Sequence, residues 1–286
     1  PSTFAATWKK AVVATVVVSL LGAGGRYVVG VDGSAASRAA LAWAVLRTLP
    51  MRPLHLVGVV EQAGAPSTPG LDEVPPRFAL MLSEAVRDLR AAFPDARVTT
   101  DLARGHVADA LDRATGPADL LVVGSDKTGY VRGRTFGVKA LQLAAALRGS
   151  LAVVPSVDLR LRTGVVVAID DRGGAPALAL RGAREAAMRS CTLTIVHAVP
   201  RDDGAQRAPS RDAALAAARD AALAAFPGLD VWTQSIARHA ADAILNVSRD
   251  RSLLLLGRSH RTTALGVGET LHEVLLNANA PTVVLR

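Results

Sequence analysis

The chain has 286 residues, 50% of them hydrophobic, which is sufficient material for two ordinary hydrophobic cores. Its net charge of +8 raises the question of nucleic-acid binding, because phosphate neutralisation drives that association. Aromatic residues make up only 3% of the chain, and most arginines lie among alanines and acids on predicted helices, so we predict no nucleic-acid partner. The single cysteine, Cys191, excludes a disulfide framework and a multi-cysteine metal cluster, and it favours a reducing cytoplasm.

The sequence opens with an N-terminal extension, residues 1–25, that contains the uncharged segment Ala11–Gly25 after two lysines. This segment is shorter than the roughly 20 apolar residues of a membrane-spanning helix. It also lacks a small-residue cleavage pattern before the first strand. We therefore expect the extension to dock on the body of the protein or on a partner subunit. Attachment to a membrane or export is the alternative, and it rests on this segment alone.

Short apolar strands alternate with helices from Tyr27 onward. The first predicted strand, Tyr27–Val31, ends at Asp32-Gly33-Ser34, and Ser34 is suited to cap the next helix. Leu41, Val45 and Leu49 recur at four-residue spacing along one face of that helix. The other strands predicted in this half are 54–60, 98–102, 120–123 and 151–154. One further helix follows the Gly/Pro-rich loop 63–76 and ends at Pro94. Two more are predicted over 107–114 and 138–147.

The second half of the chain repeats the first. AAFPDARV (91–98) returns as AAFPGLDV (224–231), and Gly124 in LLVVGSD returns as Gly257 in LLLLGRS, both at an offset of 133 residues. We predict domains over 26–155 and 164–286, joined by a linker over 156–163. The strands expected in the second copy are 165–169, 193–197, 231–235, 253–256 and 283–285. Its expected helices are 175–187, 212–226, 240–248 and 268–277.

This alternation predicts an α/β protein with two tandem doubly wound domains, each a five-stranded parallel sheet covered by helices on both faces. Ligands of such sheets bind at the carboxyl ends of the strands, where Asp32, Gly124, Asp170 and Gly257 fall. Glycine-rich loops and helix N-termini donate backbone N–H groups to anions, so the first copy is suited to a nucleotide. The structural alternative is that these glycines serve only tight turns.

The phrase VVGVDGSAASRAALAWA, the strand-turn VVGSD and the tandem repeat resemble the universal stress protein family, in the two-domain form typical of actinobacteria. The resemblance implies the adenine nucleotide alpha hydrolase-like fold and a cytoplasmic role in the stress response. It also implies a homodimer or a pair of domains within one chain. Some members of this family bind ATP through a loop of Gly, two residues, Gly, nine residues, Gly and then Ser or Thr.

Carried onto the first copy, the resemblance implies ATP or a related adenine nucleotide as the ligand. The implied binding residues are Asp32, Gly33, Ser34, Val59, Gly124, Ser125, Lys127, Gly137 and Val138. Two of them depart from the family loop, because Lys127 replaces its second glycine and Val138 replaces its hydroxyl residue. We expect the first site to be weakened by these changes but retained.

The corresponding residues of the second copy are Asp170, Ala198, Gly257, Arg258 and Gly268. Here His260 replaces the second glycine, the loop is shorter by two residues, and Glu269 places a carboxylate where phosphates would bind. Like charges at close range repel by on the order of several kcal/mol in a partly dry cleft. We therefore expect the second site to be degenerate.

No nucleophile elbow, phosphate-binding lysine motif or paired metal-ligand spacing occurs in the sequence, so we predict no catalytic residue, no bound metal and no enzymatic activity beyond slow, incidental ATP hydrolysis. His106 and His239 occupy equivalent positions in the two copies, which indicates a shared structural role. The predicted function is a stress-response regulatory module. The alternative is a nucleotide-free scaffold or dimerisation protein.

Overall fold

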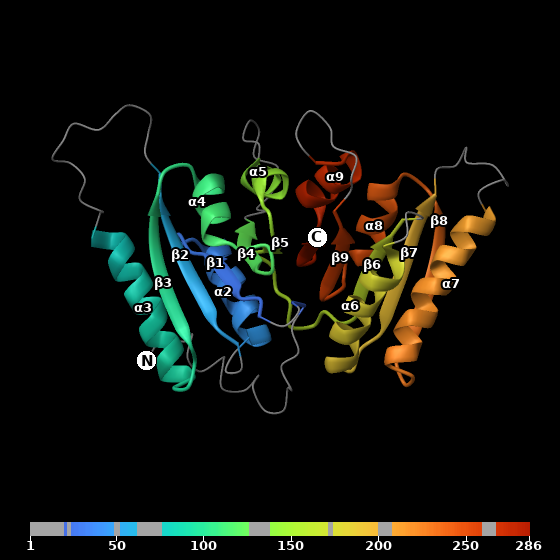
Figure 1. The fold of residues 1–286 in the computed structure, drawn as a ribbon, viewed down its shortest axis with the longest axis horizontal. Coiled ribbons are helices and arrows are strands. Elements are labelled where there is room, and N and C mark those ends of the chain that lie inside the picture. Colours follow the sequence, from blue (N-terminus) through green and yellow to red (C-terminus); the bar gives the residue numbers. More distant parts are fainter. Residues whose placement is uncertain are drawn as a thin grey trace. The chain divides into compact units, whose positions relative to one another are not determined.

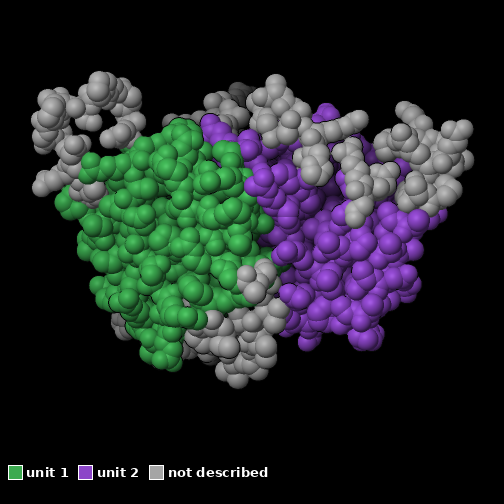
Figure 2. All heavy atoms as spheres, viewed as in Figure 1, with its two compact units in different colours: residues 1–128, 146–156 green, residues 129–145, 157–286 purple. Residues whose placement is uncertain are grey.

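The computed structural model describes residues 20–21, 24–48, 52–61, 76–125, 138–170, 174–199, 208–258 and 267–286. The chain divides into two compact units, coloured separately in Figure 2. Unit 1 comprises Pro1–Thr128 and Ala146–Ser156, and unit 2 comprises Gly129–Ala145 and Val157–Arg286.

Unit 1 is built on a five-stranded parallel sheet. Its strands are β1 (Tyr27–Gly30), β2 (Leu54–Val60), β3 (Val98–Arg104), β4 (Leu120–Ser125) and β5 (Ser150–Pro155). Its helices are α2 (Ala35–Thr48), α3 (Pro76–Ala92) and α4 (Val107–Ala114). The strand order is β3-β2-β1-β4-β5, so the chain winds outward from β1 in both directions (Figure 1). This order is that of a doubly wound sheet.

Three glycines show which helices cover each face of the unit 1 sheet. A Cβ atom at Gly58 would point at Leu82 of α3, and one at Gly124 would point at Ala36 of α2. A Cβ atom at Gly30 would instead point at Leu111 of α4. Since neighbouring residues along a strand face opposite sides, the register places α2 and α3 on one face and α4 on the other.

The core of unit 1 consists of strand residues that are apolar on both faces. All six residues of β5 and the first three of β1 are buried. The edge strand β3 has only its first residue buried, and its sequence VTTDLAR is correspondingly polar. Central strands covered by helices on both faces exclude polar residues, and an edge strand does not.

A charged cluster joins two strands where they begin. The Asp119 carboxylate accepts hydrogen bonds from the backbone N–H of Arg26 (2.8 Å), from Nη2 of Arg26 (2.8 Å) and from the N–H of Gly116 (2.9 Å). The side chain of Asp119 is 7% exposed. Burial alone raises the pKa of this carboxyl group, but the hydrogen bonds from Arg26 and Gly116 outweigh burial and hold the pKa below its usual value. The cluster ties the start of β1 to the start of β4.

Unit 2 repeats this architecture. Its strands are β6 (Val165–Ile169), β7 (Leu193–Val199), β8 (Val231–Ala237), β9 (Leu253–Gly257) and β10 (Thr282–Leu285). Its helices are α6 (Ala175–Met188), α7 (Ala208–Ala225), α8 (Ala240–Ser248) and α9 (Glu269–Asn277), together with α5 (Val138–Ala146). The strand order β8-β7-β6-β9-β10 repeats that of unit 1 (Figure 1). β6 is buried along its whole length.

The predicted fold class, two tandem doubly wound α/β domains, is therefore confirmed. The periodicity of the first helix is also confirmed at Leu41 and Val45, which are buried, whereas Leu49 lies outside the described residues. α5 lies within the predicted first domain, 26–155, but groups with unit 2 in the structure.

The N-terminal extension is described only at its end. Leu20 and Leu21 are buried, and a Cβ atom at Gly25 would overlap the backbone carbonyl of Ala118, so this end of the extension lies against the loop before β4 in unit 1. Most of Ala11–Gly25 lies outside the described residues. Within the part of the chain that the structure describes, no helix combines the length and the apolar character needed to cross a membrane.

The Asp119 cluster makes a testable prediction about unit 1. Hydrogen bonds to charged groups contribute about 1.5–3 kcal/mol, so Asp119→Asn should lower the free energy of unfolding of unit 1 by about that amount at neutral pH. Urea unfolding followed by the fluorescence of the buried Trp43, in a Trp8→Phe/Trp232→Phe background, measures this. Ser252 occupies the equivalent position in unit 2 and donates its hydroxyl to the Gly164 carbonyl (2.8 Å), so Ser252→Ala is the matched control.

The same cluster determines how the stability of unit 1 changes with pH. Because folding lowers the pKa of Asp119, its stabilisation is present above the usual carboxyl pKa and is lost as the pH falls below about 4. The Asp119→Asn variant should therefore lose less stability on acidification than the parent protein. Identical acid profiles for the two proteins would contradict this role for Asp119.

Candidate functional site

The turn after β1 is closed by its own side chains. Oδ1 of Asp32 accepts a hydrogen bond from the N–H of Ser34 (2.9 Å). Oγ of Ser34 accepts a hydrogen bond from the N–H of Ser37 (3.0 Å). Ser34 is therefore the N-cap of α2, as the sequence predicted. Gly33 has φ +81°, a conformation that favours glycine. The turn thus fixes the start of α2 directly after the strand.

Two residues that the sequence analysis did not single out also hold this turn. The guanidinium of Arg38 donates a hydrogen bond to the Gly33 carbonyl, and Sδ of Met81 lies 3.1 Å from the position that a Cβ atom at Gly33 would occupy. Arg38 lies early on the same helix, so its reach to the turn is a local feature of the sequence. Met81 comes from α3, and no local pattern identifies it.

The topology brings several of the predicted residues to one edge of the unit 1 sheet. β1 lies between β2 and β4, and Val31 continues the pairing by donating its N–H to the Val57 carbonyl (2.9 Å). Asp32, Val59 and Ser125 therefore all stand at the carboxyl edge, where Asp32 is exposed and the other two are half-buried. The structure thus gathers Asp32, Gly33, Ser34 and Ser125 around the ends of adjacent central strands.

Gly124 has a steric reason to be glycine. A Cβ atom there would lie 2.7 Å from the amide nitrogen of Ser37 and closer still to the carbonyl group of Ala36. The first turn of α2 therefore lies directly against β4, and only a residue without a side chain permits that approach. This requirement is independent of any ligand.

The loop part of the predicted first site is not described. Lys127 and Gly137 lie outside the described residues. Val138 is the first residue of α5, in the segment that groups with unit 2.

The turn after β6 in unit 2 differs from its counterpart. Asp170 is exposed at the end of β6, and Ala198 of β7 is half-buried at the position that corresponds to Val59. The N-cap of α6 is Gly174, which has no side chain to accept a capping hydrogen bond, and Pro176 follows in the first turn. Two more residues separate Asp170 from α6 than separate Asp32 from α2, so this turn is longer and lacks a side-chain cap.

Three further residues of the predicted second site have local roles. Among the described residues, a Cβ atom at Gly257 would meet Cδ2 of Leu178 alone, at 3.8 Å, so none of them requires glycine there. Nη2 of Arg258 donates a hydrogen bond to the Ala144 carbonyl in the last turn of α5 (2.9 Å). Gly268 is the buried N-cap residue of α9, and its carbonyl accepts a hydrogen bond from the N–H of His272.

His106 and His239 are the N-cap residues of α4 and α8, so their predicted equivalence is confirmed. Nδ1 of His106 lies 4.0 Å from a carboxylate oxygen of Asp109, within its own helix. Nδ1 of His239 lies 3.5 Å from Oε2 of Glu273, which belongs to α9. His260 lies outside the described residues, and His197 is buried in β7.

A groove elsewhere in unit 1 is unrelated to the predicted site. It lies between α3 and β3 and is lined by Ser83, Arg87, Arg90, Thr100 and Asp101 among others. None of the predicted nucleotide-binding residues that the structure describes lines it. The groove therefore offers no support for the nucleotide hypothesis.

Comparison with known proteins agrees with this architecture. The model of the universal stress protein family matches the chain twice, over residues 25–155 and 162–286. The chain therefore belongs to the universal stress protein family, as a tandem member with two copies of the family domain. This confirms the resemblance found in the sequence.

The relatives found include universal stress proteins MT2699 and Rv2624c of Mycobacterium tuberculosis, from strains CDC 1551 and H37Rv. Each is 28% identical over 182 residues, which is 61% of this chain and 65% of the relative's length. This source is consistent with the actinobacterial type. Among solved structures, a universal stress protein from Archaeoglobus fulgidus superposes with a TM-score of 0.73, over 94% of this chain and 98% of its own, at 15% identity. At that identity the likeness concerns the fold.

The contrast between Gly124 and Gly257 provides a direct test of the site geometry. Gly124→Ala forces a methyl group into the backbone of α2, and we expect it to destabilise unit 1 by about 1–3 kcal/mol or more. The equivalent change Gly257→Ala meets only ordinary contact and should change stability by about 0.5 kcal/mol or less. Chemical denaturation of both variants measures the difference. Equal effects of the two substitutions would contradict the close approach of α2 to β4.

Proposed function

We propose that this protein is a cytoplasmic stress-response regulatory module that binds an adenine nucleotide, ATP or a close relative, in its first copy and does not turn it over as an enzyme. The observation that carries the proposal is the capped turn Asp32-Gly33-Ser34 at the carboxyl edge of the unit 1 sheet. This is the edge at which doubly wound sheets bind their ligands.

The chain's own residues suit the two halves of a nucleoside. The Asp32 carboxylate is exposed and is held in place by the N–H of Ser34, and a carboxylate accepts hydrogen bonds from ribose hydroxyl groups. Val59, half-buried at the end of the neighbouring strand, offers an apolar surface of the kind that an adenine ring contacts. The proposed regulation follows if a bound nucleotide contacts the loop after β4 and so alters the surface offered to partners.

The differences between the copies support a single site. Unit 2 has a longer turn in place of the capped one, with Gly174 as the N-cap of α6, and Glu269 places a carboxylate in the first turn of α9. Negative charge there opposes the phosphates that a helix N-terminus otherwise favours. We therefore propose no nucleotide for the second copy.

The competing proposal is a nucleotide-free scaffold or dimerisation protein. It is favoured by Lys127 and Val138 at positions where the family loop has glycine and a hydroxyl residue. It is also favoured by Gly124, whose identity the contact with α2 explains without any ligand.

Calorimetric titration of the full chain with ATP decides between the two proposals. We expect about one ATP per chain, and Asp32→Ala should weaken binding by about 10- to 100-fold, since a hydrogen bond to a charged group contributes about 1.5–3 kcal/mol. The matched control is Asp170→Ala, which removes the strand-end aspartate of the second copy and should leave the affinity unchanged. Absence of binding heat in the parent protein would favour the scaffold, and equal effects of the two substitutions would place the nucleotide elsewhere.

A further inference from the structure

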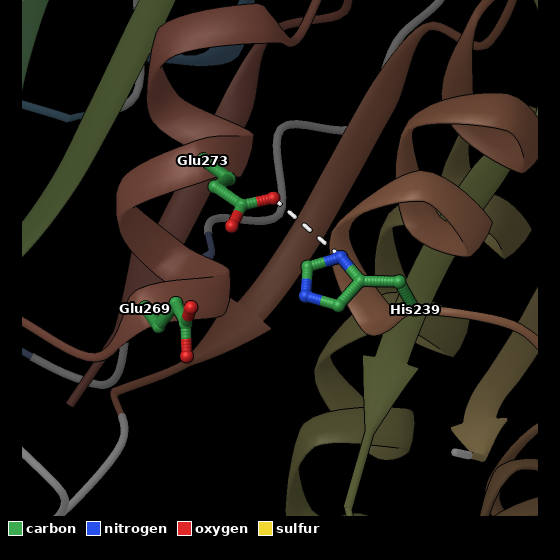
Figure 3. A group of neighbouring side chains, drawn as sticks. All are labelled: His239, Glu269 and Glu273. Carbon is green, nitrogen blue, oxygen red and sulfur yellow. Dashed lines mark ion pairs between the residues drawn. The ribbon is translucent and has the colours of Figure 1, made fainter. Parts of the chain in front are cut away.

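Unit 2 holds a group of metal-ligating side chains that the sequence analysis did not assemble. His239 precedes α8, and Glu269 and Glu273 stand one helical turn apart on α9, with the imidazole ring beside them (Figure 3). One ligand atom from each residue can be chosen so that all three lie within 4.8 Å of one another. Nδ1 of His239 is already 3.5 Å from Oε2 of Glu273. This group is called the His239 cluster below.

These distances suit a small divalent cation. Zinc binds imidazole nitrogen and carboxylate oxygen at about 2.0–2.2 Å, so two ligand atoms on a tetrahedral ion lie about 3.4 Å apart. The separation between His239 and Glu273 matches that value without rearrangement. Glu269 needs only a shift of its side chain, which is exposed and lies in the first turn of the helix.

The charge arrangement also favours a cation. Glu269 and Glu273 occupy positions i and i+4 of α9, where like charges repel each other and destabilise a helix. A bound cation converts that repulsion into attraction to both carboxylates. One imidazole nitrogen with two carboxylate oxygens is a ligand set of the kind that zinc and related transition metals accept, whereas magnesium prefers oxygen ligands alone.

The first copy lacks this set at equivalent positions. The helices α5 and α9 both have nine residues, and the residues of α5 that correspond to Glu269 and Glu273 are Val138 and Gln142. The equivalent histidine, His106, lies near an aspartate of its own helix instead. The paired carboxylates therefore belong to the second copy only.

We infer that the second copy binds a divalent transition-metal ion of the zinc class through His239, Glu269 and Glu273. This site lies at the N-terminus of α9. In the first copy, the N-terminus of the equivalent helix, α5, is proposed to face a nucleotide. The carboxylate that excludes phosphates from the second copy thereby becomes a metal ligand. The bound ion joins the start of α8 to α9 and stabilises unit 2, because it binds the folded state and not the unfolded one.

Titration of the chelator-treated full chain with ZnCl2, in a non-coordinating buffer without nucleotide, tests this inference. We expect one high-affinity zinc ion per chain and a rise in the melting temperature of unit 2. His239→Ala and Glu273→Gln should each weaken binding at least 10-fold, and Glu269→Gln should also weaken it. The matched control His106→Ala removes the equivalent histidine of the first copy and should leave zinc affinity unchanged.

Several outcomes would overturn the inference. Absence of zinc binding in the parent protein would leave the His239 cluster as a structural ion pair. Binding that survives His239→Ala and Glu273→Gln in folded protein, or that falls equally with His106→Ala, would place the metal at another site. Displacement of zinc by a modest excess of Mg²⁺ would contradict the histidine ligand. Since the titration contains no nucleotide, its result is independent of ATP binding in the first copy.

Discussion

The close approach of α2 to β4 at Gly124 organises the first copy. Because the backbone of Ala36 and Ser37 occupies the space of a side chain there, α2 must begin directly above the ends of the central strands. The short turn Asp32-Gly33-Ser34, with its positive φ and its serine cap, is the connection that this start requires. The exposed carboxylate of Asp32 is consequently fixed at the edge where doubly wound sheets generally bind their ligands.

In the second copy, a helix also lies close against a strand, but a different glycine permits the approach. Its close approach is made by a glycine of the helix, since a Cβ atom at Gly182 of α6 would overlap Cγ2 of Val167 in β6. Gly257 lacks the close contact that constrains Gly124, and the turn after β6 is longer than the turn after β1 and has no side-chain cap. The two copies keep one fold while the chemistry at their carboxyl edges diverges.

The polar groups at the ends of the strands differ between the two copies. At the amino ends of the central strands, unit 1 uses the ion pair of Arg26 and Asp119, whereas unit 2 uses a neutral hydrogen bond from Ser252 to Gly164. At the carboxyl end, the helix that begins with Val138 in one copy begins with Glu269 in the other. Burial of the central strands supplies most of the stabilisation, so polar groups at their ends can change without loss of the fold.

The sequence by itself determined the elements, the doubly wound class and the serine cap, because each depends on neighbours along the chain. Runs such as VVVAI and SLAVVP are buried strands, as their continuous apolar character predicted, and Ser34 caps a helix that starts at the next residue. The sequence also predicted Asp32 and Gly124 at one edge of the sheet, since parallel strands bring their carboxyl ends together. The loop with Lys127 and Gly137 lies outside the described residues and stays a prediction.

Only the tertiary structure decided why Gly124 is glycine, what Arg258 bonds, and that His239 meets Glu273. In each case the partner is distant in sequence: Ala36 for Gly124, the Ala144 carbonyl for Arg258, and a residue of α9 for His239. No local period or cap encodes such a pairing, because it depends on how helices are rotated and seated on the sheet. The sequence fixes an element through interactions with its neighbours along the chain, whereas a site requires the side chains of several elements to meet in space.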